Sequence, residues 1–193
     1  MSKGLKTVIR DLLPERYQVP LKYLYGWLRG GLEEEMRFLP VLVGQGDRVI
    51  DIGGNRGVYA YRLWRLGAKV EVFEPNPTCF AVQQSWATGK PSVHLYSVAL
   101  SSYSGSANLH IPVDEAGVEH DASASIEQSG FVQARDQLVS LATLDSYRFE
   151  NVGLTRLMSL CWLRALSGRS GSKPMPLDLI GRYRSNHVWT FTF

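Results

Sequence analysis

The sequence predicts an α/β fold with a Rossmann-like parallel sheet, and three observations support that prediction. Apolar segments at 48–52, 69–74 and 92–98 alternate with two segments of helical pattern, in the order β-α-β-α-β. The short spacing between these strands favours right-handed crossovers and parallel pairing. A glycine-rich turn follows the first strand, and an acidic residue, Glu74, stands at the end of the second. The turn and the acid together are typical of one half of a nucleotide-binding domain.

Two helices are expected before the sheet, at 20–29 and 32–43. Pro20 suits the first turn of a helix, whereas Pro40 is expected to kink or divide the second helix. Each helix carries apolar residues that recur at helical spacing. These residues are Leu21, Leu24, Tyr25 and Leu28 in the first helix, and Met36, Leu39 and Val43 in the second.

The helices between the strands are marked by their ends and by their apolar faces. The first is expected at 57–66, directly after the glycine-rich turn. The second begins at Pro77 with Asn76 as its N-cap, because an Asn side chain accepts a hydrogen bond from an N–H of the first turn. Their core-facing residues are Ala60, Leu63 and Trp64 in the first, and Cys79, Val82 and Trp86 in the second.

The strand–helix alternation ends after residue 100. Alternating patterns at 106–113 and 138–144 predict two further strands, and the Ser-, Gly- and acid-rich segment 114–130 predicts a loop between them. Residues 151–193 show no clear alternation. They hold six Lys+Arg and one Asp+Glu, against 15 and 17 in residues 1–150, so the net charge of +3 arises from this last part.

Composition argues against several functional classes. Scattered charges without a basic stripe argue against a nucleic-acid partner. Cys79 and Cys161 form neither a metal-ligand pattern nor a disulfide framework, which favours a reducing cytoplasm. Apolar runs stay shorter than the ~18 residues of a membrane span. Asp11 and Pro14 interrupt the N-terminal stretch before a secretory signal could form.

The glycine-rich turn, residues 51–57, has the sequence Asp-Ile-Gly-Gly-Asn-Arg-Gly, a D-x-G-x-x-x-G pattern. Gly53 allows the chain to leave the strand sharply, and Gly54 removes a side chain where a ligand would lie. Asn55 tolerates positive φ better than most residues. Gly57 allows the following helix to pack closely on the strand.

Two kinds of ligand compete for this turn. A dinucleotide would need the pattern G-x-G-x-x-G, and the first of its glycines falls on Ile52. S-adenosylmethionine carries no pyrophosphate and suits an acid two residues before the first glycine. Asp51 would then orient the turn or meet the ammonium group of this cofactor, while Glu74 would bind two ribose hydroxyls. Asn76 is either a helix cap alone or also an adenosine contact.

Five segments occur in an order and spacing that is specific over residues 30–150. They are 31–35 (GLEEE), 46–57 (GDRVIDIGGNRG), 72–77 (VFEPNP), 97–101 (SVALS) and 144–147 (LDSY). In these segments the chain resembles the FkbM family of S-adenosylmethionine-dependent methyltransferases. The resemblance implies a class I methyltransferase sheet and methyl transfer, usually to a hydroxyl oxygen of a sugar or natural product. It also implies cofactor roles for the turn and Glu74, with Ala99 bordering the adenine.

The chain departs from the family after residue 154. The family continues into a fourth parallel strand that carries Ile-Asp-Val-Glu-Gly, whereas this chain continues with Thr-Arg-Leu-Met-Ser. The acidic motif is missing, and the rest of the sheet is expected to be missing with it. A change of reading frame in the gene is one hypothesis for this departure and for the basic charge that follows. The predicted division is an N-terminal helical segment (1–45), a cofactor-binding Rossmann-like domain (46–154) and an atypical basic tail (155–193).

A hydroxyl acceptor benefits from a general base, and several residues are candidates for that role. His120 is the candidate catalytic residue, because a loop that closes over the substrate could bring it to the acceptor. Ligand spacing for a metal site is not evident. Two other functions stay open, namely a cofactor-binding but inactive fragment and an NAD-linked oxidoreductase. The full set of candidate bases is His94, His110, His120, Asp114, Glu115, Glu119 and Asp121.

Overall fold

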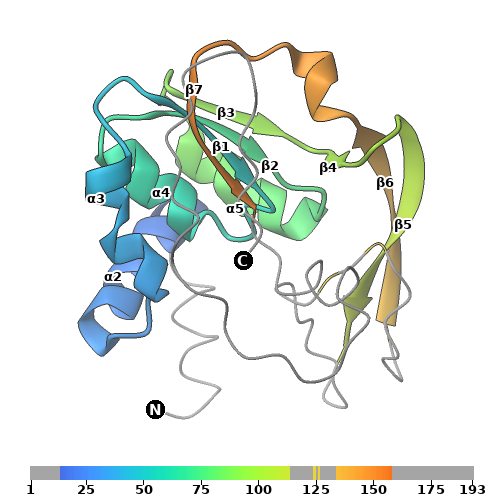
Figure 1. Cartoon of the computed structure of the whole chain (residues 1–193). Helices are drawn as coiled ribbons and strands as arrows, with labels where there is room; N and C mark the ends of the chain where they lie inside the picture. Colours follow the sequence, from blue (N-terminus) through green and yellow to red (C-terminus); the bar gives the residue numbers. More distant parts are fainter. Residues whose placement is uncertain (1–13, 114–123, 125, 127–133, 158–193) are drawn as a thin grey trace, which may run out of the picture.

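The computed structural model describes residues 14–113, 124, 126 and 134–157 of the chain (Figure 1). Its centre is a four-stranded sheet in which every neighbouring pair is parallel, with the strand order β3-β2-β1-β7. The predicted Rossmann-like α/β fold is therefore confirmed. The strands are β1 (Arg48–Ile52), β2 (Lys69–Phe73), β3 (Val93–Tyr96) and β7 (Val152–Leu157).

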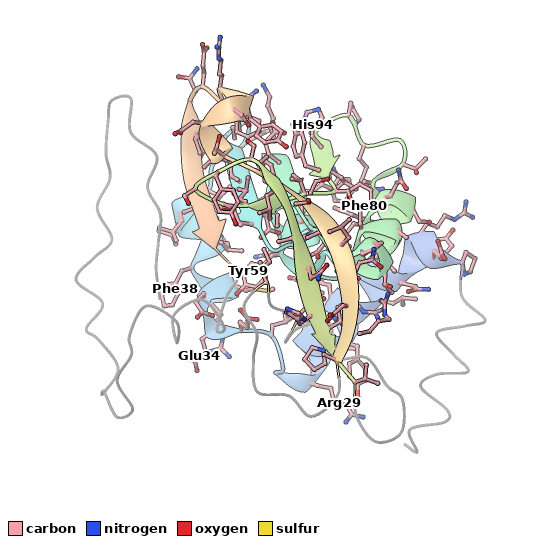
Figure 2. All side chains as sticks on the ribbon, turned by 90° about the vertical axis from the view of Figure 1, so that its right-hand side faces the viewer. Arg29, Glu34, Phe38, Tyr59, Phe80 and His94 are labelled. Carbon is pink, nitrogen blue, oxygen red and sulfur yellow. The ribbon has the colours of Figure 1, made fainter. Side chains whose placement is uncertain are left out.

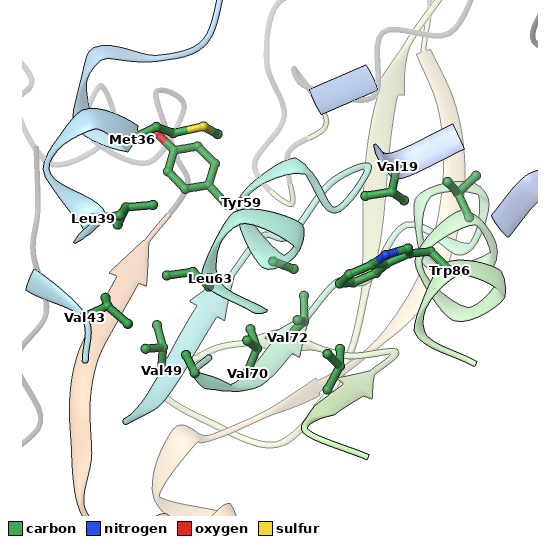
Figure 3. Packing of buried hydrophobic residues seen from close by; sticks show 14 residues of the cluster. Val19, Met36, Leu39, Val43, Val49, Tyr59, Leu63, Val70, Val72 and Trp86 are labelled. Atoms are coloured by element: carbon green, nitrogen blue, oxygen red, sulfur yellow. The ribbon is translucent and has the colours of Figure 1, made fainter. Parts of the chain in front are cut away.

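Two crossover helices, α4 (Val58–Arg65) and α5 (Pro77–Ala87), connect β1 to β2 and β2 to β3. Both cover the same face of the sheet, because their apolar residues pack into one cluster with the valines of β1, β2 and β3 (Figure 3). The predicted core faces are confirmed in this cluster, with Cys79 also buried on α5. The cluster contains Ala60, Leu63, Val82 and Trp86 from the helices, and Val49, Val70, Val72 and Val93 from the strands.

The N-terminal helical segment packs outside this layer. It consists of η1 (Glu15–Tyr17), α2 (Gln18–Arg29), η2 (Glu34–Arg37) and α3 (Leu39–Leu42). Pro40 lies in the first turn of α3, so the predicted second helix is indeed divided. Helix α2 contacts α4 and α5 and buries Val19. Its predicted apolar residues instead face outward. Among the described residues, no helix has the length and apolar character that crossing a bilayer demands.

The opposite face of the sheet carries aromatic rings. Phe73 stacks on Tyr96 with 4.7 Å between ring centroids, and the rings of Tyr147 and Phe149 pack against both. Tyr147 ends the short helix η4 (Leu144–Tyr147), which follows the second sheet. The segment between that sheet and β7 therefore covers this face with side chains.

A buried carboxylate, that of Glu71, lies on the same face and is 2% exposed. Its Oε1 lies 3.2 Å from Nε of Arg48, and its Oε2 lies 3.1 Å from Nδ1 of His94. The Tyr96 hydroxyl donates to the same Oε2 over 3.0 Å. Burial, followed by this hydrogen bond and the negative charge of Glu71, raises the pKa of Tyr96 to about 12.

A second sheet has three strands in the order β4-β6-β5 and follows the carboxyl end of β3. Its strands are β4 (Ala99–Leu100), β5 (Gly105–Pro112) and β6 (Ala134–Ala142). Strands β5 and β6 pair antiparallel from Gly105↔Leu141 to Pro112↔Ala134. Both were expected from alternation, although β6 begins earlier than the predicted 138–144 segment.

The sequence predicts no fourth strand in the parallel sheet, and that prediction is wrong. Strand β7 pairs parallel with β1, from Arg48↔Val152 to Ile52↔Leu157, with one register shift near its start. Its last three residues belong to the segment that we expected to be a tail. Within the described residues β7 lies at the edge of the sheet beside β1, and its sequence Val-Gly-Leu-Thr-Arg-Leu has a weak alternation of apolar and polar residues.

Candidate functional site

Six of the eight residues predicted to bind the cofactor, all except Asp51 and Ala99, lie at the carboxyl ends of β1 and β2. From β1 the chain proceeds to β2 and β3, and then returns to the other side of β1 as β7. Ligands of open α/β sheets bind outside the carboxyl ends of the strands at such a reversal of strand order. The reversal lies between β1 and β7, directly beside the turn that follows Ile52. Strand β7 thus adds a reason for a site here that the sequence did not supply.

The turn adopts left-handed backbone conformations at three residues. Gly53 has a φ of 75°, Asn55 a φ of 46° and Gly57 a φ of 75°. Glycine adopts such values without a steric cost, and Asn tolerates them better than most side chains. The predicted conformational roles of Gly53 and Asn55 are confirmed.

The N–H groups of the glycines donate hydrogen bonds within the protein. Gly53 and Gly54 both donate to the carbonyl oxygen of Phe73, over 2.8 and 3.2 Å. Gly57 donates to the carbonyl oxygen of Gly54 over 2.8 Å. The first two bonds fasten the turn to the end of β2, and the third closes the turn on itself. The three glycine amides therefore do not form an open cradle for a phosphate group.

Glu74 links the turn to the start of α5. Its Oε2 accepts a hydrogen bond from the Asn55 N–H over 2.5 Å, and its Oε1 accepts one from the Asn76 N–H over 2.7 Å. The residue is 5% exposed. The carboxylate thus points toward the turn after β1, which is the orientation that a shared site requires.

Asn76 is the N-cap of α5. Its Oδ1 accepts a hydrogen bond from the Thr78 N–H over 3.0 Å, and Pro77 occupies the first helical position, as predicted. Asn76 is buried, and its own N–H donates to Glu74. The capping role is confirmed, whereas the contact with adenosine stays a prediction.

Gly54 is needed for a different reason from the one we predicted. A Cβ at this position would lie 2.3 Å from Cγ1 of Val72 and 2.9 Å from Nε2 of Gln83. A Cβ at Gly57 would lie 3.2 Å from Cγ of Gln83 and 3.4 Å from Cγ1 of Val19. The space beside both glycines is therefore filled by the protein's own side chains, from β2, α5 and α2.

Two residues of α5 hold the turn, and sequence reasoning missed this role for both. Gln83 is fully buried, and its Nε2 donates to the carbonyl oxygen of Asn55. The Cys79 Sγ lies 3.6 Å from the Asn55 Oδ1 and donates to it. Cys79, Val82, Gln83 and Trp86 share one helix face by their spacing. A glutamine on that otherwise apolar face was the available signal.

The other predicted cofactor residues occupy different surroundings. Asp51 is fully buried in β1, in register with Val72 of β2. Ala99 begins β4 and packs into the apolar cluster of the second sheet with Leu109 and Leu141. Within the described residues, the contacts of Ala99 are with the second sheet and not with the turn. Its place beside an adenine stays a prediction.

The candidate bases divide into three groups. His94 on β3 pairs with Glu71, so its contacts are those of the aromatic face. His110 on β5 lies opposite Asp136 on β6, and its Nδ1 is 2.6 Å from the Asp136 Oδ1. A carboxylate at Nδ1 orients an imidazole and leaves Nε2 for chemistry. His120 and the acidic candidates 114, 115, 119 and 121 lie outside the described residues. Within the described residues, no group of three or more His, Cys, Asp or Glu side chains could hold a metal.

No protein-family model matches this chain, and no curated protein matches its sequence. One solved structure with similarity is a proposed methyltransferase from an antibiotic biosynthesis pathway of Anabaena variabilis ATCC 29413. The two chains are 18% identical with a TM-score of 0.27, and the match covers 34% of this chain and 32% of that chain. The match thus spans about a third of the length of the solved structure.

Proposed function

We propose that this chain binds S-adenosylmethionine and transfers its methyl group. The observation that carries the proposal is the hydrogen bond between the turn after β1 and the carboxylate after β2. The Asn55 nitrogen and the Glu74 Oε2 lie 2.5 Å apart at the carboxyl ends of β1 and β2, and the reversal of strand order lies on the other side of β1. This arrangement suits a nucleoside whose ribose meets Glu74 and whose other end lies over the turn.

The hydrogen-bond donors of the turn favour this cofactor over a dinucleotide. A pyrophosphate would require open backbone N–H groups, but Gly53, Gly54 and Gly57 donate to carbonyl oxygens of the protein. Ile52 also stands where the dinucleotide pattern requires a glycine. S-adenosylmethionine has no pyrophosphate, and its positive charges suit a site that contains Asp51 and Glu74.

Each residue of the site has a binding or orienting role in the proposal. Glu74 accepts hydrogen bonds from the two ribose hydroxyls, and Asp51 orients the turn or meets the ammonium group. Asn76 and Ala99 border the adenosine. The bound cofactor supplies an electrophilic methyl group on sulfur. The protein supplies mainly alignment, which for well-oriented groups is worth ~7–11 kcal/mol.

The acceptor in this proposal is a hydroxyl group of a sugar or natural product, which is what the FkbM resemblance implies. A base near that hydroxyl would take its proton as the methyl group arrives. His120 remains the predicted base. Among the described histidines, His110 is the alternative, because Asp136 holds its Nδ1.

Isothermal titration with S-adenosylhomocysteine and with NADH tests the cofactor assignment. We expect S-adenosylhomocysteine to bind and NADH not to bind. Glu74→Ala should weaken the binding by about 1–3 kcal/mol, or about 5- to 150-fold, because two charge-assisted hydrogen bonds are lost. Glu34→Ala is the matched control, since Glu34 is exposed on η2.

The same titration distinguishes the alternatives. Binding of NADH in preference to S-adenosylhomocysteine would contradict the proposal, and an unchanged affinity in Glu74→Ala would remove Glu74 from the site. Turnover is then measured as release of S-adenosylhomocysteine with candidate hydroxyl acceptors. Binding without turnover for every acceptor would favour the inactive, cofactor-binding chain.

A further inference from the structure

Helix α2 presents an apolar stripe to the outside of the molecule. Leu21, Leu24 and Leu28 are 40%, 46% and 68% exposed. Their spacing places them on one side of the helix, together with Tyr25. In Figure 1, α2 is the blue helix at the outer edge of the molecule. Apolar residues at helical spacing usually face the protein core, but this stripe faces away from it.

The opposite side of α2 attaches the helix to the protein. Val19 is fully buried and lies against Gly57 of the turn. The Tyr23 ring packs against the Tyr61 ring of α4 at 5.1 Å between centroids. One side of the helix is thus already packed, and the leucine stripe is a separate surface.

The charges and the aromatic residue beside the stripe point to its partner. Lys22 and Arg29 are the charged residues of α2, and they lie on one flank of the stripe. Trp27 lies on the other flank and is 62% exposed. Basic side chains with leucines and an aromatic residue are typical of helices that lie in the plane of a membrane surface.

The described part of the N-terminal segment is more basic than the rest of the described protein. Residues 14–29 hold three Lys+Arg and one Asp+Glu, whereas residues 30–113 and 134–157 hold ten of each. An anionic surface would therefore attract the α2 end more strongly than the other described parts. Figure 2 shows Arg29, the last residue of α2, and His94 of β3 at opposite ends of the view.

We propose that the outer face of α2 docks on an anionic lipid bilayer, with Leu21, Leu24 and Leu28 entering the interface. Lys22 and Arg29 would reach the lipid headgroups from the edge of the stripe. A second copy of this chain is a poorer partner. Two such faces would bring four basic side chains together, and α2 has no acidic residue to pair with them. The inference is independent of the cofactor assignment.

Co-sedimentation with lipid vesicles tests the proposal. We expect the full chain to bind vesicles of equimolar phosphatidylcholine and phosphatidylglycerol, to bind phosphatidylcholine alone weakly, and to dissociate as salt is added. Each basic residue near an anionic surface contributes about fivefold to binding. Loss of both charges in the double variant Lys22→Gln with Arg29→Gln should therefore weaken binding by about 25-fold.

Leu28→Ser provides the test of the apolar contact, and Leu138→Ser is its matched control. Both leucines are 68% exposed, but Leu138 lies on β6. We expect about tenfold or greater loss for Leu28→Ser and no loss for Leu138→Ser, with unchanged circular dichroism in both. Failure of the full chain to bind anionic vesicles at low salt would overturn the proposal, as would equal losses in the two variants. A dimer in light scattering that Leu28→Ser converts to a monomer would instead assign the face to a second copy.

Discussion

Two buried glutamates of the β2 region differ in what surrounds them. Glu71 and Glu74 are 2% and 5% exposed and stand three residues apart. The carboxylate of Glu71 contacts the side chains of Arg48, His94 and Tyr96. The carboxylate of Glu74 instead accepts hydrogen bonds from two backbone N–H groups at the carboxyl edge of the sheet.

The comparison shows that burial of a carboxylate alone does not indicate a binding site. Charged and aromatic side chains surround Glu71 and compensate for the removal of its charge from water. Glu74 lies at the carboxyl edge of the sheet, where its neighbours are a positive-φ turn and a helix N-cap. We therefore assign a structural role to Glu71, and we propose a ligand-binding role for Glu74.

The largest effect is expected from Glu71→Leu. This change leaves Arg48 and His94 without their carboxylate and should lower the free energy of unfolding by about 3 kcal/mol. We choose the lower end of the range for a broken buried pair, because both partners reach solvent. Urea denaturation measures the loss. Folded Glu71→Leu should bind S-adenosylhomocysteine with the affinity of the natural chain. A weaker affinity would contradict the difference in role between Glu71 and Glu74.

A smaller effect, on binding, is expected from Gln83→Leu. The change removes the donor to the Asn55 carbonyl, so the turn that faces Glu74 is held less firmly. A buried acceptor that loses its partner costs about 1–2 kcal/mol, and we expect a similar loss in cofactor affinity by calorimetry. The neighbouring Gln84 is exposed, so Gln84→Leu serves as the control. Equal affinities in the two variants would show that the turn needs no support from α5.

The smallest effect concerns Tyr96, on the Glu71 side. Because the pKa of Tyr96 is raised to about 12 from an ordinary 10, its stabilising effect is present below pH 10 and is lost as pH rises toward 12. Tyr96→Phe should cost about 1 kcal/mol at neutral pH. The difference in unfolding free energy between the two proteins should then narrow between pH 10 and pH 12. A constant difference across this window would argue against the hydrogen bond to Glu71.

Local sequence patterns were sufficient to predict much of the local structure around the candidate site. Apolar runs bounded by Gly, Asn and Pro predicted β1, β2 and α5, and the residue types at Gly53, Asn55 and Asn76 predicted their backbone roles. These features depend on near neighbours in the chain. The orientation of Glu74 toward the turn also followed from the parallel pairing of two adjacent strands.

Features that depend on distant packing could not be predicted in the same way. Helical spacing identified the leucine stripe of α2, but spacing does not show which side of a helix meets the protein. The residues of β7 show no regular alternation of apolar and polar side chains, and the strand is defined by its pairing with β1. The support that Gln83 gives to the turn is visible only from its contact with Asn55, because a single glutamine on a helix is usually exposed.

Backbone amide NMR during a titration with S-adenosylhomocysteine tests the role of Glu74 most directly. The N–H groups of Asn55 and Asn76 donate to its carboxylate, so they report any ligand that reaches it. We predict larger shifts for these two amides than for those of Arg48 and His94, which surround Glu71. Shifts confined to the Glu71 side, or no shifts at either glutamate, would contradict the assignment of Glu74 to the cofactor site.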